Sequence, residues 1–99
     1  MAYFAIRFAL KYDAGPARRR LCDELERLGG VEAADLFYMI ELDGTAAEVR
    51  DYFRTFLAER DLLIVIQFEQ RPEFAAPWAG VQEWIEARFS PAKLPTRSR

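Results

Sequence analysis

The segment DLLIVIQF, residues 61–68, carries apolar side chains at consecutive positions, and this constrains the fold more than any other feature of the sequence. Successive side chains of a strand point to opposite faces of its sheet. A strand with one face in water therefore alternates apolar and polar residues. This segment does not alternate, and residues 36–42 (LFYMIEL) show the same pattern. The sequence thus predicts a sheet that needs cover on both faces, and we expect self-association to provide it.

Length and composition indicate one small domain. A chain of 99 residues is long enough for a single core, and we expect one domain over residues 1–89 and a disordered basic tail over 90–99. The longest apolar stretch is far shorter than the ~20 residues of a spanning helix, and the start lacks the basic region and cleavage site of a signal peptide. A single cysteine, Cys22, suits a reducing compartment. We therefore expect a cytoplasmic protein without membrane contact.

Periodicity predicts the order strand, helix, short strand, strand, helix, strand. Pro16 is placed in the first turn of one helix and Gly29-Gly30 at its end, as is typical of these residues. Thr45 and Glu48 have the spacing of a capping box and predict the start of the second helix. Alternation and apolar runs predict strands at residues 3–10, 31–34, 36–42 and 62–68.

This order predicts an α+β fold of the ferredoxin-like βαββαβ type, in which two helices cover one face of a four-stranded antiparallel sheet. A short C-terminal helix is expected beyond it, because Val81, Trp84, Ile85 and Phe89 recur at helical spacing. We expect the helices to cover the sheet face with these side chains: Phe4, Ile6, Phe8, Ile64 and Ile66.

The opposite face is predicted to be an interface between two copies of the chain. An extensive apolar patch usually marks an interface, and a two-fold homodimer is the simplest arrangement. Arg7 is the unusual charged member, and we expect an ion pair with Glu41 or Glu69, with a phosphate contact as the alternative. The predicted dimer interface residues are Tyr3, Ala5, Arg7, Ala9, Phe37, Met39, Leu63 and Val65.

Candidate catalytic groups are limited to carboxylates. The chain has no histidine, which removes the commonest general base and metal ligand, and Cys22 has no base to activate it. Asp13, Asp35 and Asp43 lie at or between the ends of predicted strands. Such a carboxylate near a two-fold axis could hold Mg²⁺ together with its symmetry mate. Each also fits an ordinary turn, which is the favoured interpretation.

The net charge of −2 is not typical of a nucleic-acid-binding protein, which is usually basic. The charge is nevertheless uneven along the chain. Arg18, Arg19 and Arg20 are consecutive, and the tail adds further cations. A solvated helix face explains this run most simply, and a phosphate-binding patch is the functional alternative. These three arginines are the predicted nucleic-acid-binding residues.

Four segments resemble the CRISPR-associated protein two family. They are FAIRFAL as the first strand, VEAADLFYMIEL as the second and third strands, TAAEVRDYFRTFLAERDLLIVIQF as a helix and the fourth strand, and PWAGVQEWIEARF near the end, together most of residues 3–89. The resemblance implies a small ferredoxin-like homodimer, and stand-alone relatives outside CRISPR loci are the closer match. Members of the family accompany the spacer-integration complex, and some act as metal-dependent nucleases.

One departure from the family bears on catalysis. The family's first strand ends in a tyrosine-aspartate pair, and the two aspartates of its dimer bind the metal. Here Phe8 and Ala9 take those positions, and Tyr12-Asp13 follows four residues later. We therefore expect a non-catalytic nucleic-acid-binding or scaffolding homodimer without a cofactor. The alternative is an Mg²⁺-dependent endonuclease, a ribonuclease or deoxyribonuclease, that uses Asp13. A small-molecule sensor is a third hypothesis, for which the sequence offers no site.

Overall fold

The structure of the chain is a computed structural model, and it describes residues 1–11, 15–75 and 79–89. The chain divides into two compact units, Met1–Glu69 and Gln70–Arg99. The first unit is an α+β fold with a four-stranded antiparallel sheet, and the second contains a helix. The elements are β1 (Ala2–Ala9), α1 (Pro16–Arg27), β2 (Val31–Ala34), β3 (Phe37–Leu42), α2 (Ala46–Arg54), β4 (Leu62–Phe68) and α3 (Ala79–Arg88).

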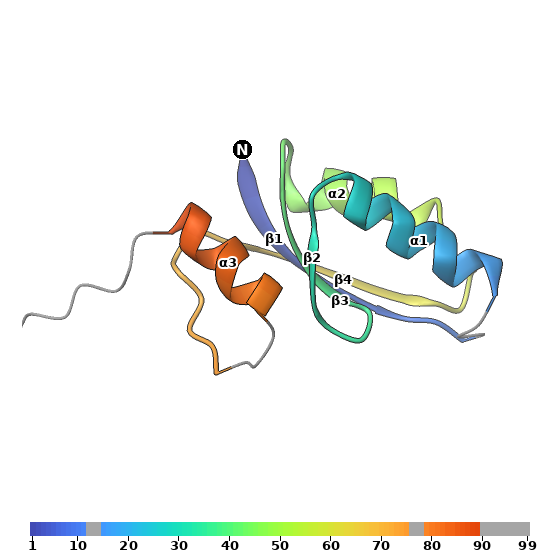
Figure 1. Cartoon of the computed structure of the whole chain (residues 1–99). Helices are drawn as coiled ribbons and strands as arrows, with labels where there is room; N and C mark the ends of the chain where they lie inside the picture. Colours follow the sequence, from blue (N-terminus) through green and yellow to red (C-terminus); the bar gives the residue numbers. More distant parts are fainter. Residues whose placement is uncertain (12–14, 76–78, 90–99) are drawn as a thin grey trace, which may run out of the picture. The chain divides into compact units, whose positions relative to one another are not determined.

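The sheet has the strand order β2-β3-β1-β4, so β1 lies in the interior and β4 at one edge. Every pairing is antiparallel. Helices α1 and α2 lie on the same side of this sheet (Figure 1). The order of strands and helices along the chain is the one that periodicity predicts, and the predicted C-terminal helix is present as α3.

Local signals in the sequence explain where the two helices of the first unit begin and end. Pro16 occupies the first turn of α1, and Gly29 follows that helix with a φ of 89°, a conformation that glycine adopts at little cost. The hydroxyl of Thr45 accepts a hydrogen bond from the Glu48 backbone N–H, and the Glu48 carboxylate accepts one from the Thr45 backbone N–H. The predicted capping box is therefore confirmed at the start of α2.

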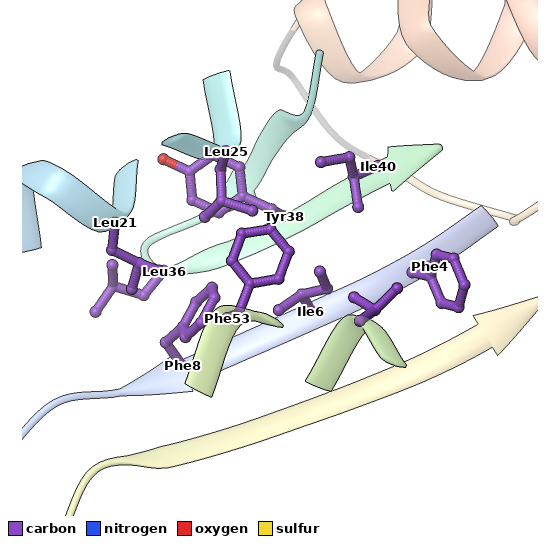
Figure 2. Close-up of a cluster of buried hydrophobic side chains, with 10 residues drawn as sticks. Phe4, Ile6, Phe8, Leu21, Leu25, Leu36, Tyr38, Ile40 and Phe53 are labelled. Carbon is purple, nitrogen blue, oxygen red and sulfur yellow. The ribbon is translucent and has the colours of Figure 1, made fainter. Parts of the chain in front are cut away.

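The core of the first unit lies between the sheet and the two helices (Figure 2). Rings at its centre make an edge-to-face contact, because those of Phe8 and Phe53 have centroids 6.2 Å apart at 77°. A buried aliphatic or aromatic side chain contributes about 1.5–3 kcal/mol, so this cluster is the main source of stability. Its buried members are Phe4, Ile6, Phe8, Leu21, Leu25, Leu36, Tyr38, Ile40, Val49 and Phe53.

The side chains of β4 lie on the opposite sides of the sheet from those predicted. Leu63 pairs with Phe8 and Val65 pairs with Ile6, so both side chains share the helix-covered face and pack against the core. Residues directly opposite each other in an antiparallel pair point to the same side of the sheet. The placement of Leu63 and Val65 on the uncovered face is therefore wrong.

The other residues of β4 take the uncovered face instead. Leu62, Ile64 and Ile66 lie opposite Ala9, Arg7 and Ala5 of β1. Their side chains are 49%, 44% and 57% exposed. The prediction failed because β4 is apolar at both sets of positions, and the alternation that assigns faces in other strands is missing here.

We predict that two neighbouring leucines of β4 differ sharply in their effect on stability. Leu63→Ala removes a side chain packed on the core and should lower the free energy of unfolding by about 2 kcal/mol. Leu62→Ala removes a half-exposed side chain and should lower it by less than about 1 kcal/mol. Urea unfolding followed by circular dichroism measures both. A larger loss for Leu62→Ala than for Leu63→Ala would contradict the register.

Candidate functional site

The sheet face turned away from α1 and α2, which we name the open face, is a candidate surface of the first unit. The structure brings six of the eight predicted interface residues together on it, and it adds residues that the sequence analysis missed. Only the pairing register reveals those, since the pattern of β4 is ambiguous. The open face consists of Tyr3, Ala5, Arg7, Ala9, Phe37, Met39, Glu41, Leu62, Ile64, Ile66 and Phe68. Met39 in this set is buried, and its exposed large apolar members are Leu62, Ile64 and Ile66.

Arg7 is exposed on the open face and is held by backbone carbonyls. Its Nη1 donates hydrogen bonds to the carbonyl oxygens of Phe8, at 2.6 Å, and of Asp35, at 3.3 Å. The predicted ion pair with Glu41 or Glu69 is therefore wrong. The guanidinium instead reaches the turn between β2 and β3, a contact between residues far apart in the sequence that periodicity does not encode. Among the described residues, no carboxylate forms an ion pair with Arg7.

Asp35 also holds the first arginine of the consecutive run. Its carboxylate forms an ion pair with the Arg18 guanidinium, and its carbonyl accepts the hydrogen bond from Arg7. The next residue, Leu36, is buried and has a φ of 56°. A leucine rarely adopts this conformation, so the surrounding packing holds the turn in a strained backbone geometry. Asp35 thus has a structural role between α1 and the sheet.

The start of α1 is the most basic part of the described surface that sequence analysis singled out. Arg19 and Arg20 are exposed, whereas Arg18 is half-buried. Gly15 caps this helix without a side-chain hydrogen bond, and the first turn contains no acidic residue. A shallow cavity of about 540 Å³ is lined there by Gly15, Pro16, Arg18 and Arg19. The positive end of the helix dipole reinforces these cations, so the region favours anions.

The remaining candidate carboxylates do not converge among the described residues. Asp43 lies 3.7 Å from the N-terminal amine at an exposed position, and Asp35 faces Arg18. Asp13 lies outside the described residues. Within residues 1–11, 15–75 and 79–89, no three histidine, cysteine, aspartate or glutamate side chains are grouped as metal ligands. None of the helices in the described part of the chain is long and apolar enough to cross a membrane.

A hydrogen-bonded network joins the outer surfaces of α1 and α2. The Glu24 carboxylate accepts hydrogen bonds from Arg27 Nε at 2.8 Å and Nη2 at 2.7 Å, and from the hydroxyl of Tyr52. The bonds from Arg27, followed by the one from Tyr52, lower the pKa of Glu24 to about 2. The same contact with Glu24 raises the pKa of Tyr52. The network therefore links the two helices most strongly while Glu24 is ionised.

Cys22 and Tyr38 lie on the covered side of the sheet. Burial, followed by the contact with the Cys22 thiol, raises the pKa of Tyr38. Cys22 itself is half-buried and packs against the core. Its surroundings agree with a structural thiol in the helix layer, since a reactive cysteine needs a neighbouring cation or base.

No protein-family model and no curated protein matches this sequence.

We predict that Glu24 makes folding stability depend on pH in the acid range. Its pKa in the folded chain is about 2, below the ordinary value of 4.5. Its contribution is therefore present above about pH 4.5 and is lost as the pH falls towards 2. Glu24→Gln should be less stable at pH 7 and should lose less stability on acidification. The stability of Tyr52→Phe at pH 7, and its loss of stability on acidification, should lie between those of the parent and of Glu24→Gln, because Arg27 still binds the Glu24 carboxylate. Urea unfolding at pH 7, 4, 3 and 2 measures this, and equal acid slopes for Glu24→Gln and the parent would refute it.

Proposed function

We propose that this chain is a ferredoxin-like homodimer, similar to CRISPR-associated protein two, that binds nucleic acid or acts as a scaffold without cutting it. The strand order supports the fold assignment. Helix α1 connects β1 to β2 across the intervening β3, and α2 connects β3 to β4 across β1. Two such split βαβ units, interleaved in one antiparallel sheet, are the ferredoxin-like arrangement.

Nucleic acid is the proposed partner because of one observation, the exposed Arg19 and Arg20 at the start of α1, which Gly15 caps without a side-chain hydrogen bond. Phosphate groups bind to guanidinium groups and to the free N–H groups at helix starts. Arg18 serves this surface indirectly, since Asp35 already engages it. The net charge of −2 confines the attraction to this local patch. We therefore propose that this surface contacts the phosphate backbone of the nucleic acid and does not discriminate between base sequences.

A second copy of the chain is the proposed cover of the open face. Leu62, Ile64 and Ile66 leave an apolar strip exposed there, and such strips favour association. The open face also carries two opposite charges, because Arg7 and Glu41 lie on either side of the Ala5–Met39 pair. A two-fold axis through that pair would bring Arg7 of each copy over the end that carries Glu41 in the other.

The second candidate function is an Mg²⁺-dependent endonuclease that uses Asp13. The resemblance alone supports it, through the Tyr12-Asp13 pair near the end of the first strand. Two Asp13 carboxylates in a dimer would offer the oxygen ligands that Mg²⁺ prefers. Incubation with labelled RNA and DNA, with and without Mg²⁺, separates the two candidates. Cleavage that Asp13→Ala abolishes would establish the endonuclease and overturn the non-catalytic proposal.

We predict that Arg19 and Arg20 account for part of the salt dependence of binding. Fluorescence anisotropy with a labelled 20-nucleotide duplex DNA and a labelled single-stranded RNA measures the affinity at several salt concentrations. For the duplex, Arg19→Ala/Arg20→Ala should reduce the slope of log K against log salt by about 2, because about one counterion is released per phosphate contact.

The matched control removes the same charge from exposed arginines elsewhere. Arg54→Ala/Arg60→Ala changes the net charge equally but leaves the start of α1 intact. It should leave the slope close to that of the parent. Equal slopes for the Arg19/Arg20 variant and this control would reject the proposed nucleic-acid surface.

We predict that a carboxylate on the open face dissociates the dimer. Ile66→Asp should weaken dimerisation by about a hundredfold or more, since an unpaired charge buried at an interface costs several kcal/mol. Gln67→Asp is the matched control, because Gln67 is the exposed neighbour on the opposite face. Sedimentation velocity should find Ile66→Asp monomeric and Gln67→Asp dimeric. Dimers of equal strength in both variants would exclude the open face as the interface.

A further inference from the structure

The two edges of the sheet differ in how they are protected against pairing with another strand. At one edge, β2 is four residues long and contains an irregularity between Glu32 and Ala34. At the other edge, β4 is seven residues long and contains neither a charge nor a proline. Short length, charge, proline and bulges are the features that keep edge strands from recruiting a partner. The edge at β4 has none of them.

Strand β4 pairs only with β1 among the described strands. One side of its backbone therefore keeps N–H and C=O groups that no described strand satisfies. An extended peptide can pair with such an edge and become an additional strand. Its alternate side chains would then point to the two faces of the sheet.

Helix α2 lies along β4 and forms a groove beside this edge. One cavity there, of about 380 Å³, is lined by Arg50, Arg54, Leu57, Ala58, Glu59, Asp61, Leu62 and Leu63. A second, of about 170 Å³, is lined by Ala46, Ala47, Arg50, Leu63 and Val65. Arg50 and Leu63 line both cavities, so the two follow one another along the strand. We call these residues the edge groove.

The edge groove is lined by two arginines and two carboxylates. Arg50 and Arg54 are exposed and lie four residues apart on α2. Within the part of the chain that the structure describes, Arg50 forms an exposed ion pair with its neighbour Asp51, at 3.0 Å, and such surface pairs are weak. The negative charges lie where β4 begins, since Glu59 lines that end and the Asp61 carboxylate accepts backbone N–H bonds there. Arg54 lines the cavity at the start of β4 together with Glu59 and Asp61. Arg50 lines both cavities, so the positive charge extends from the start of the strand along it.

We propose that the β4 edge binds an extended peptide segment of another protein in which apolar and acidic residues alternate. The peptide backbone pairs with β4. Its acidic side chains point to the α2 side and meet Arg50 and Arg54, and its apolar side chains lie beside Ile64 and Ile66 on the open face. Charge complementarity selects the acidic residues, and the period of two along a strand selects the alternation.

The same charges disfavour a second copy of this chain at the edge. A two-fold axis beside β4 would align the α2 helices of both copies along one seam. With the axis beside Arg50, the Arg50 side chains of the two copies would meet, and like charges across an interface oppose association. The peptide backbone pairs with the edge of β4, and its apolar side chains border Ile64 and Ile66, which the dimer proposed through the open face also uses.

The test uses the full chain and an amide-capped, fluorescently labelled peptide of four valine-glutamate repeats. Fluorescence anisotropy compares it with a peptide of four valine-lysine repeats and with the valine-glutamate peptide methylated at every backbone nitrogen. The proposal predicts that the valine-glutamate peptide binds at least about tenfold more tightly than either comparison peptide. The valine-lysine peptide carries the opposite charge, and the methylated peptide lacks the backbone donors.

Variants of the protein locate the site. Arg54→Glu should reverse the preference in favour of the valine-lysine peptide, whereas the matched Arg60→Glu should retain the parent's preference. Equal binding of all three peptides would overturn the proposal, and so would an unchanged preference in Arg54→Glu. Loss of labelled RNA binding in Arg50→Ala/Arg54→Ala, without any binding of the valine-glutamate peptide, would assign the groove to nucleic acid and would also overturn it.

Discussion

The register of β1 between β3 and β4 is the constraint on which the rest of this structure depends. Phe4, Ile6 and Phe8 alternate strictly along β1 and are fully buried, so they fix which side of the sheet the helices cover. Each neighbouring strand then takes its orientation from its pairing with β1. Through this pairing Leu63 and Val65 join the core. The apolar strip of β4 is left on the open face as a consequence of the same register.

Much of the fold could be predicted from local patterns. The alternation of β1 identified its buried face, and the capping box of Thr45 and Glu48 located the start of α2. The faces of β4 could not be predicted, because apolar residues occupy both sets of positions and periodicity carries no information there. The partner of Arg7 could not be predicted either. Its hydrogen bond to Asp35 joins residues far apart in the sequence across a turn that holds Leu36 at a positive φ.

The candidate surfaces could be predicted only where a local pattern in the sequence marks them. The three consecutive arginines are visible in the sequence, but only the structure separates Arg18, which pairs with Asp35, from the exposed Arg19 and Arg20. The edge groove left no signal in the sequence, since it requires α2 beside β4. The start of α1 is formed by residues apart from the other two surfaces, whereas the open face and the edge groove adjoin at Leu62. We propose that such a chain works by holding partners together, which agrees with a scaffolding role.

The most direct test of this account is the nuclear Overhauser contacts of the β4 methyl groups in the unmodified chain. The register predicts that methyl groups of Leu63 and Val65 lie close to aromatic protons of the core, those of Phe8 and Phe53 in particular. Methyl groups of Ile64 and Ile66 should show no contact with these two rings. Contacts from Ile64 and Ile66 to Phe8 or Phe53, with none from Leu63 and Val65, would contradict the account.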